Sequence, residues 1–550
     1  MDDFKGQLTL RSIVIGCVGC VIITAASMYT ALKMGALPWP IIFVALISLF
    51  FLRICGSRSL NEANVTHTIM SAGSMVAGGL AFTIPGIWIL GAGEVSFVQM
   101  LLVALGGTAL GLVGCALFRE QFIEKQQLEF PIGQAAAETL KAGDKGGRTG
   151  AQLFGAMGFA GLWAALRDIL GAIPAMLFAD LAIPGITFGI YVSPMMVAVG
   201  FLVGAGAMVA WFGGALGQLA IVTGGSALGF YDVAAGQAIN SSLGMGLMMG
   251  CGIAVVVKDV LPKLVGLVRG RSSAADGGVR KGGAKSASGT IVSLAVCCAA
   301  LVCCILLGVG PVGSVIVVLL SFATVAMSAQ SVGQTGIDPM EIFGLIVLLL
   351  VAAIGDTASL PLFFVAGVIA VACGIGGDVM NDFKAGHALG TSSKAQLIGQ
   401  AIGGLLGSVV AAGTLFALVT AYGPGAFGVG HDFVAAQANV VATLVGGIPS
   451  LPAFIVGLVA GFVIYVLGGP AMMIGLGVYL PFYMSFTAFL GCLVKWIYDA
   501  IVKSKQANLS EEDRAAAKLR SDQSGLVVAS GLLGGESIVG VCIALAAVFM

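Results

Sequence analysis

The sequence predicts an all-α protein: a polytopic transmembrane helical bundle of about 14–16 spans, with two structurally repeated halves and broken or re-entrant helices. Three observations predict this class. Hydrophobic residues make up 58% of the 550 residues, charged residues make up only 9%, and apolar runs of roughly 20 residues, the length of a membrane span, recur throughout. Because soluble domains carry roughly 25% charged residues, so few charges could not cover a soluble globule of this size.

The apolar runs begin close to the N-terminus and are expected to form the membrane spans. The N-terminal stretch Met1–Gln7 is short, mixed in charge and without a cleavable signal pattern, so the run after Arg11 is expected to stay as the first helix. Several runs are short or interrupted by Gly and Pro, and some of these are expected to be half-helices. The expected segments are 11–34, 38–55, 64–90, 96–118, 151–178, 195–222, 241–261, 289–309, 311–330, 341–356, 358–376, 396–421, 434–448, 451–468, 471–500 and 525–549.

Three polar stretches separate groups of these runs. Lys258–Lys285 holds seven Lys/Arg against two acidic residues, and Lys495–Arg520 holds six Lys/Arg, so the positive-inside rule predicts that both are cytoplasmic. Arg119–Arg148 has five charges of each sign and is expected outside, which requires 61–90 to be a re-entrant or broken pair. The predicted domains are an N-terminal transmembrane half, 1–261, a cytoplasmic basic Gly/Ser-rich linker, 262–288, and a C-terminal transmembrane half, 289–550.

The composition also excludes several classes of protein. Lys+Arg and Asp+Glu balance at 26 each, so no basic excess favours nucleic acid, and neither disorder nor a secreted disulfide scaffold fits. Most of the twelve cysteines lie in apolar runs. The densest group, Cys297–Cys304, has no nearby His or acidic residue to complete a metal site, so we predict apolar packing, with no metal and no cofactor.

Glycine occupies 83 positions, and pairs spaced by four residues recur. Small residues at this spacing let helix backbones approach closely in lipid, so most glycines are expected to serve packing. A minority are expected to break helices beside a binding site. The spaced pairs are Gly107/Gly111, Gly200/Gly204, Gly213/Gly217, Gly246/Gly250, Gly403/Gly407 and Gly457/Gly461.

An internal repeat predicts the two halves. Gly35-Ala-Leu-Pro38 and Gly336-Ile-Asp-Pro339 both lie between apolar runs, about half a chain apart. Further on, Asn61-Glu-Ala-Asn-Val-Thr-His67 has a counterpart in Asn381-Asp-Phe-Lys-Ala-Gly-His387. This match gains weight because the chain has only three histidines and two of them fall in register. Transporters built from such repeats bind substrate near the bilayer midplane, where the halves meet.

Ionisable residues within apolar segments are the candidate functional residues, because such groups are costly in a membrane and usually face its interior cavities. They are Lys33, Glu62, His67, Arg167, Asp168, Asp356, Asp378, Asp382, Lys384, His387 and Glu536. Structural alternatives exist: Lys33 could snorkel to an interface, the adjacent Arg167 and Asp168 could lie at a helix end, and Glu536 could be a paired structural charge.

Asp378–His387 is the densest of these segments. On a helix, Asp378 and Asp382 share a face, with Lys384 and His387 on neighbouring turns; the alternative is a solvated loop. The repeat places Glu62 and His67 at the corresponding site, and carboxylates and imidazoles that face one cavity could take up and release a coupling proton.

These residues also carry a family resemblance. Asp378-Val-Met-Asn-Asp-Phe-Lys-Ala-Gly-His387, with Thr391-Ser-Ser-Lys394 and Gln400-Ala-Ile-Gly403 behind it, resembles the signature of the oligopeptide transporter (OPT) superfamily, above all its yellow-stripe-like branch. The stretch 61–68 resembles the family's Q-E-N-x-V-x-Q-T element, with His67 in place of glutamine. Phe130–Ala137 resembles F-P-x-G-T-A-x-A with Gln134 in place of threonine, and Gly475–Pro481 and Ser530–Ser537 are also similar to the family.

The resemblance implies a multi-pass secondary active transporter of the plasma membrane, driven by protons, that carries short oligopeptides or peptide-like metal chelates. Compact loops and the absence of a long N-terminal tail favour a bacterial-type member. The expected partners are this substrate, protons and the lipid bilayer, with no nucleic acid, and a homo-oligomer is left open. The expected substrate or proton-coupling residues are Glu62, Asn64, His67, Asp378, Asp382, Lys384 and His387; the motif and helix-break residues are Pro131, Gly133, Gly477, Tyr479, Pro481 and Glu536.

A passive channel and a membrane-embedded enzyme are the two alternative classes of protein. A passive channel would share the halves and the glycines but would need no acid–base cluster inside the membrane. A membrane-embedded pyrophosphatase or protease is disfavoured, because the acidic residues are not clustered as Mg²⁺ chemistry requires and neither H-E-x-x-H nor G-x-S-x-G occurs. We therefore predict that the protein is not an enzyme.

Overall fold

The computed structural model describes residues 4–34, 40–144, 149–178, 181–254, 257–258, 287–335, 338–354, 359–506 and 510–549. Most of the predicted linker, 262–286, lies outside these residues, as do Gly35-Ala-Leu-Pro38, the Gly336-Ile337 part of its counterpart, and Asp356.

The chain divides into two compact units. Unit 1 comprises 1–144, 252–419 and 437–445, and unit 2 comprises 145–251, 420–436 and 446–550. Each unit therefore takes segments from both predicted halves. The division into halves at 262–288 stays a prediction.

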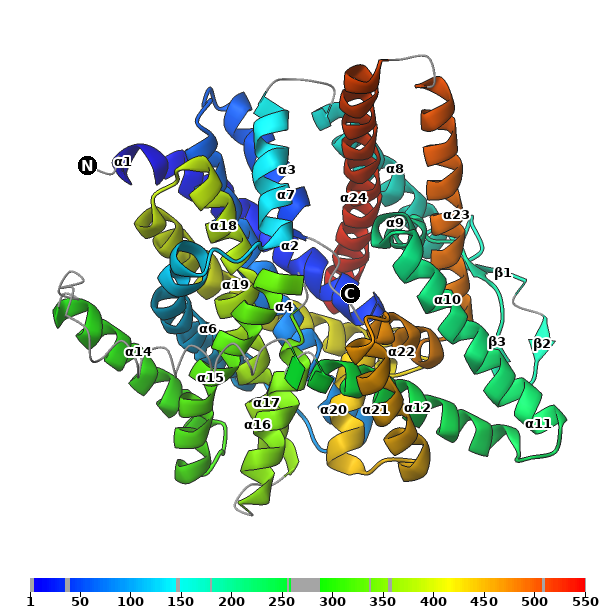
Figure 1. Cartoon of the computed structure of the whole chain (residues 1–550). Coiled ribbons are helices and arrows are strands. Elements are labelled where there is room, and N and C mark those ends of the chain that lie inside the picture. Colours follow the sequence, from blue (N-terminus) through cyan, green and yellow to red (C-terminus); the bar gives the residue numbers. More distant parts are fainter. Residues whose placement is uncertain are drawn as a thin grey trace. The chain divides into compact units, whose positions relative to one another are not determined.

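Unit 1 is built almost entirely from helices (Figure 1). Its α-helices are α1 (Phe4–Gln7), α2 (Leu10–Met34), α3 (Pro40–Ile54), α4 (Leu60–Ala81), α5 (Gly86–Leu90), α6 (Phe97–Arg119), α7 (Pro131–Asp144), α14 (Ala287–Leu306), α15 (Pro311–Thr335), α16 (Met340–Ala353), α17 (Ser359–Cys373), α18 (Met380–Leu389), α19 (Ser393–Tyr422) and α20 (Ala436–Gly446). Two π-helical segments, Glu120–Lys125 and Gly374–Asp378, follow α6 and α17.

Unit 2 contains helices and two short antiparallel strand pairs. Its α-helices are α8 (Thr149–Asp168), α9 (Pro194–Val203), α10 (Ala205–Leu219), α11 (Gly225–Ala227), α12 (Val233–Ala254), α21 (Leu451–Val466), α22 (Ala471–Tyr479), α23 (Phe482–Lys505) and α24 (Glu511–Phe549), with a π segment at Ala220–Gly224 and a 3₁₀ turn at Pro424–Ala426. Strand β1 (Met176–Leu177) pairs with β4 (Ile190–Tyr191), and β2 (Ala182–Ile183) pairs with β3 (Ile186–Thr187). The sequence did not predict these strands.

The transmembrane bundle is confirmed. Nine helices of the described residues are long and apolar enough to cross a membrane, and six shorter apolar helices of 10–17 residues accompany them. Two candidate spans, Leu60–Leu90 and Ser359–Leu389, have 83% and 89% of their most apolar window buried, against 28–56% for the other seven. These two spans contain the two elements matched by the sequence repeat, so the repeat marks the innermost helices of unit 1.

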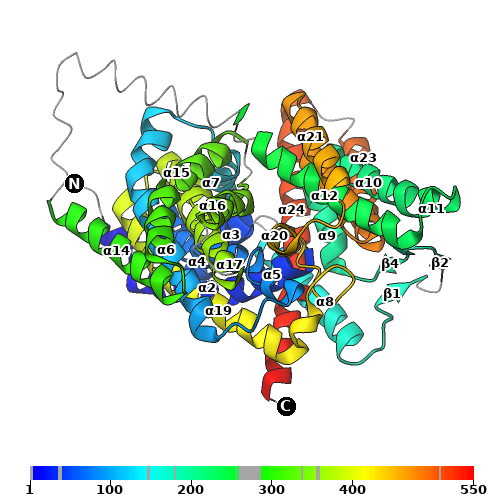
Figure 2. The same ribbon diagram turned by 90° about the horizontal axis from the view of Figure 1, so that it is seen from below.

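Glycines allow the closest helix contacts, as their spacing predicted. A Cβ at Gly403 or Gly407 of α19 would meet the backbone of Ile69 or Gly73 on α4, so only a glycine fits at either place. Gly246 and Gly250 of α12 and Gly457 and Gly461 of α21 pack reciprocally in the same way, and Gly107 and Gly111 of α6 face α17. Figure 2 shows α6, α15 and α17 side by side.

Two of the predicted glycine pairs behave differently. At Gly213 a Cβ would meet nothing within 4 Å; its neighbour Gly214 makes the close contact, with the backbone of α22. Gly200 packs on the backbone of α23, but Gly204 has φ +86° and separates α9 from α10. A left-handed φ of this kind favours glycine, so Gly204 belongs to the minority that break a helix.

Breaks also occur in the elements that carry the sequence motifs. Helix α4 ends at Ala81, and a turn through Pro85 separates it from α5. The segment Gly374–Asp378 widens the helix between α17 and α18 into a π turn, a feature often found at functional sites. The prediction of broken helices is therefore confirmed, and the Asp378–His387 segment is helical instead of a solvated loop.

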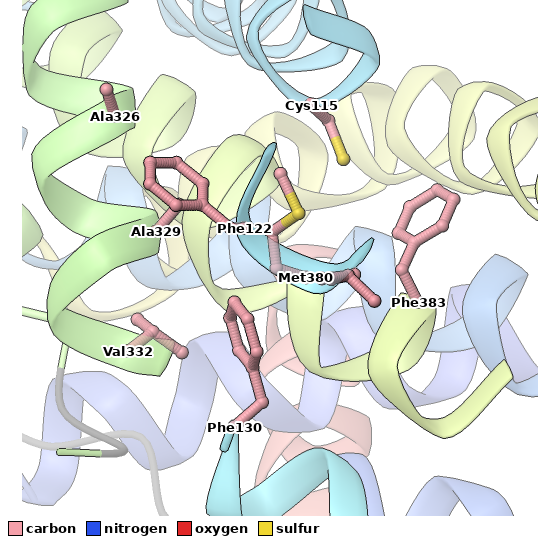
Figure 3. Close-up of a cluster of buried hydrophobic side chains, with 9 residues drawn as sticks. Cys115, Phe122, Phe130, Ala326, Ala329, Val332, Met380 and Phe383 are labelled. Carbon is pink, nitrogen blue, oxygen red and sulfur yellow. The ribbon is translucent and has the colours of Figure 1, made fainter. Parts of the chain in front are cut away.

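An aromatic core fixes the position of α18 within unit 1. Met380 and Phe383 of α18 are buried with Phe122 and Phe130 in one cluster, whose labelled side chains converge in Figure 3. Phe130 also donates its backbone N–H to the Gly333 carbonyl at 2.9 Å. Apolar packing therefore contributes to the position of the first turn of α18, in addition to its polar contacts.

Candidate functional site

The two elements matched by the repeat meet at a buried histidine–aspartate pair. His67 of α4 and Asp382 of α18 approach with Nε2 and Oδ1 3.3 Å apart, and both side chains are 0% exposed. Ser71, one turn further along α4, donates a hydrogen bond to Asp382 Oδ2. His67 and Ser71 are four residues apart and so share a face of α4. The pair therefore links α4 to α18 inside unit 1.

Helix α19 supports the same junction. Gln396 Nε2 donates to the backbone carbonyl of Asp382 at 2.8 Å and lies 3.5 Å from Thr68 Oγ1. A Cβ at Gly386 would collide with the Gln396 side chain, so the glycine of the motif makes room for this amide. The junction is therefore built by three helices, and its polar side chains lie among packed helices.

Glu62 has a different environment, although it occupies the position matched to Asp382. Arg11 forms a bidentate ion pair with its carboxylate, with Nε 2.7 Å from Oε1 and Nη2 3.0 Å from Oε2. The hydroxyls of Thr9 and Ser57 donate to the same two oxygens. Because Glu62 also lies in the first turn of α4, the helix dipole favours its negative charge. This arrangement fastens α2 to the start of α4.

The asparagines of the two elements also form structural contacts. Asn64 is fully buried, and its Nδ2 lies 3.5 Å from Thr391 Oγ1, which itself donates to Asn61 Oδ1 at 3.0 Å. Asn381 accepts from the backbone N–H of Gly133 at 3.1 Å and donates to the Asp378 carbonyl at 3.0 Å. Both motifs therefore tie the ends of their helices to neighbouring segments.

The Phe-Pro-Ile-Gly stretch of the sequence starts α7 beside α18. Pro131 occupies the first position of α7, where no intrahelical N–H is needed. A Cβ at Gly133 would meet the carbonyl of Asn381, so this glycine allows α7 and α18 to touch. Pro131 and Gly133 thus have a packing role at the edge of the candidate site.

Lys384 and His387 point away from the buried pair. Lys384 is half-buried, and its Nζ donates to the backbone carbonyl of Leu128 at 2.6 Å. His387 is exposed near the end of α18. Of the four residues expected to converge, Glu62, His67, Asp382 and His387, the structure brings only His67 and Asp382 together.

Asp378 belongs to a wider group of carboxylates around Asp382, which the sequence showed only in part. It ends the π segment, and Asp382, Asp338 and Glu341 lie near enough to interact with it electrostatically. Asp338 stands within the repeated Gly-Ile-Asp-Pro motif, and Glu341 begins a predicted apolar run, so the signal was an acidic residue beside an apolar segment. Arg11, Ser71 and Gln396 were also missed, because nothing in the sequence tells which helices they face.

The C-terminal motifs lie in unit 2. Tyr479 ends α22 and Pro481 precedes α23, so the apolar run expected over 471–500 is divided into two helices at these motif residues. A Cβ at Gly477 would meet the Trp211 carbonyl of α10. Asn240 of α12 donates to the Val478 carbonyl, 2.8 Å away, near the end of α22.

Glu536 is the centre of an ion-pair network in unit 2. Arg167 Nη1 lies 2.8 Å from Glu536 Oε1, and the two side chains are 1% and 2% exposed. The hydroxyl of Ser193 and the backbone N–H of Met195 also donate to the carboxylate. Asp168, the last residue of α8, accepts two bonds of 2.7 Å from Arg167. Arg167 and Asp168 therefore lie at a helix end, and Glu536 is a paired charge, as the structural alternatives for these residues stated.

The aromatic side of this network is Tyr191. The Arg167 guanidinium lies over its ring, 5.0 Å from the centroid, a cation–π geometry. Burial raises the pKa of the Tyr191 phenol, which therefore stays neutral at physiological pH. Among the described residues, no group of three or more His, Cys, Asp or Glu side chains is placed to hold a metal ion.

The fold and the buried junction define a class of protein: a helical, multi-pass membrane protein whose most enclosed spans meet through ionisable side chains, as in membrane transporters. The chain belongs to the OPT family, described as OPT oligopeptide transporter protein, whose pattern matches residues 7–257 and 285–547. It is also 24% identical, over an aligned length of 604 that covers 94% of this chain and 92% of the other, to a Haemophilus influenzae protein named "Putative oligopeptide transporter".

Proposed function

We propose that the protein is a secondary active transporter of the plasma membrane that takes up short oligopeptides or peptide-like metal chelates with protons, by alternating access. Membership of the OPT family and the name of the Haemophilus influenzae relative support the transport of oligopeptides. The observation that carries proton coupling is the buried contact between His67 and Asp382.

The charge of this pair depends on a single proton. With neutral imidazole and ionised carboxylate, the pair carries a net negative charge in a fully buried place, which is costly. One added proton makes the pair neutral overall, either as an ion pair or as two uncharged groups. Histidine is the side chain whose unperturbed pKa lies near physiological pH, so proton uptake there can follow a physiological gradient.

The position of the pair lets a proton act on helix packing. Asp382 lies in the first turn of α18, directly after the π segment, and His67 lies on α4. A gain or loss of attraction between these two helices changes the relative stability of arrangements in which they are close or apart. A two-state element biased by a proton is what coupled alternating access requires.

The substrate side of the proposal rests on the family and on the polar groups near this junction. Short peptides and amino-acid-like chelates carry both ammonium and carboxylate groups, and Lys384 and the carboxylate of Asp378 offer complementary charges on the α17–α18 element. The motif at 378–387 supports assignment to the yellow-stripe-like branch, and compact loops support a bacterial-type member; metal chelates are included as substrates because of the branch assignment.

Uptake into proteoliposomes tests the proposal. Labelled tetrapeptides and nicotianamine-like chelates are offered with and without an inward proton gradient. We expect gradient-dependent uptake of at least one substrate, lost in Asp382→Asn and changed in its pH profile in His67→Gln. His431→Gln is the matched control, because His431 is exposed in a loop of unit 2. Uptake by Asp382→Asn that is unchanged and insensitive to the gradient would instead favour a passive channel.

A further inference from the structure

A cavity with both polar and apolar lining residues lies in unit 2. It has a volume of about 890 Å³ and is bordered by the end of α9, the end of α23 and the beginning of α24. Its basic lining residues are Lys495, Lys503, Arg514 and Lys518. Its apolar lining residues include Phe201, Leu202 and Leu526. One cavity therefore combines cationic and apolar lining residues.

The acidic residues of the cavity both lie near the same lysine. Asp499 and Asp522 are its two carboxylates, and both lie near Lys495, at 2.7 Å and 3.8 Å from its Nζ. Lys503 and Lys518 are exposed and form no ion pair with any residue of the described ranges. With four basic and two acidic lining residues, the cavity has an excess of two positive charges, and Lys503 and Lys518 are the cations that form no ion pair within the described ranges.

Two further contacts give the cavity a defined shape. Arg514 Nε donates to the backbone carbonyl of Gln506 at 3.2 Å, which holds the guanidinium at the rim. Lys495 Nζ lies over the Phe201 ring, 5.3 Å from its centroid, where the apolar and cationic walls meet. The Tyr498 hydroxyl donates to the Ser521 carbonyl at 2.8 Å and so fixes α23 to α24 beside the cavity.

The surrounding helix surface places the cavity at the edge of the hydrocarbon region. α23 is a candidate span, and its Trp496, Ile497 and Ile501 side chains are 41%, 61% and 49% exposed, as expected for groups that face lipid. The lysines follow within the next turn. The positive charge of Lys495–Arg520 predicts that this end is cytoplasmic, the leaflet in which anionic lipids gather.

We propose that this cavity binds an anionic phospholipid of the cytoplasmic leaflet, with its phosphate group between Lys503, Lys518 and Arg514. Ammonium and guanidinium groups bind phosphate through charge-assisted hydrogen bonds. The acyl part of the lipid would lie along Phe201 and Leu202, and a volume of about 890 Å³ is in the range of pockets that hold small ligands. A soluble phosphate ester would use the same cations but would leave the apolar wall empty.

Lipid titration followed by native mass spectrometry tests the proposal. The full-length chain in a neutral detergent is titrated with short-chain phosphatidylglycerol, with phosphatidylcholine and with inorganic phosphate. We expect saturable binding of phosphatidylglycerol in preference to phosphatidylcholine, and no displacement by inorganic phosphate in moderate excess. The double variant Lys503→Gln/Lys518→Gln is expected to bind phosphatidylglycerol about tenfold or more weakly, since each lysine near an anionic lipid surface contributes substantially to affinity.

The control removes equal charge from the same region. Lys505→Gln/Arg520→Gln alters residues of α23 and α24 that do not line the cavity, so it should retain most of the binding. Unchanged melting temperatures in detergent without added lipid exclude unfolding as the cause. Equal losses in both double variants, equal binding of the two lipids, or tighter binding of inorganic phosphate than of the lipid would each overturn the proposal.

Discussion

Glu536 is a buried carboxylate whose removal should lower the stability of unit 2. Its carboxylate accepts hydrogen bonds from the Arg167 guanidinium, the Ser193 hydroxyl and the Met195 backbone N–H, all between 2.8 and 2.9 Å. These bonds join α24 to α8 and to the beginning of α9. Because Arg167 and Glu536 are almost completely buried, removal of one charge leaves the other without its main compensation.

We expect Glu536→Gln to destabilise the protein by about 3 kcal/mol. Breaking one side of a buried ion pair typically costs about 3–5 kcal/mol, and the lower end applies because Arg167 keeps its two bonds to Asp168. In folding units of roughly 200 residues this corresponds to a fall in melting temperature of about 6–12 °C. The assay is thermal unfolding of purified protein in one detergent, followed by intrinsic fluorescence.

Asp168→Asn is the matched control, because Asp168 contacts the same guanidinium from a side chain that is 30% exposed. Solvent screening limits such a contact to about 1 kcal/mol, so its melting temperature should fall by no more than about 4 °C. Arg167→Met added to Glu536→Gln should restore part of the lost stability, since no buried charge is then unpaired. Equal effects of Glu536→Gln and Asp168→Asn would refute the reasoning.

Three further predictions concern unit 1. Gly407→Ala should destabilise the protein by about 1–3 kcal/mol in the same melting assay, because its Cβ would meet the Cα of Gly73. Gly413→Ala on the same helix is the control: its Cβ would meet only Phe97, at 4.0 Å, so this variant should be neutral or slightly stabilising. Arg11→Gln should lower stability by about 1–3 kcal/mol because Glu62 loses its charged partner, while Arg58→Gln, which removes an exposed arginine from the same region, should change little. Gly386→Ala should weaken the contact between α18 and Gln396 by about 1 kcal/mol or more, and loss of this effect in Gly386→Ala/Gln396→Ala would confirm the contact.

Composition was sufficient to predict the class of fold, because the requirement for long apolar segments is local and additive along the chain. The detail of packing was not. Gly213 and Gly214 are neighbours in sequence, yet they point about 100° apart on α10, and only the second meets α22. The strand pairs between Met176 and Tyr191 have only two residues per strand, which is too short for an alternating pattern to stand out.

Two members of the buried junction, His67 and Asp382, were among the residues that the sequence marked, whereas their pairing and their neighbours Ser71 and Gln396 were not. The repeat marked His67 and Asp382 because two of only three histidines fell in register with acidic neighbours. The same register suggested equal roles for Glu62 and His387, but side-chain environment depends on the helices that pack alongside. At Glu62 that neighbour is α2, which supplies Arg11, and at the end of α18 His387 is exposed.

The hydrogen-bond donors around each buried carboxylate distinguish carboxylates that hold helices together from one that could exchange a proton. Glu62 and Glu536 each have a guanidinium and at least two further donors, so both can remain ionised and hold helices together. Asp382 has Ser71 on one oxygen, and on the other the imidazole of His67, which favours ionisation of the carboxylate most strongly when the imidazole is itself protonated. A carboxylate with a permanent cation beside it is a poor carrier of a proton, because the cation stabilises the charged form at every physiological pH. A carboxylate whose partner is a histidine can change charge together with that partner. Of the acidic residues that the repeat and the C-terminal motif singled out, Asp382 is therefore the one to which we assign the proposed proton coupling.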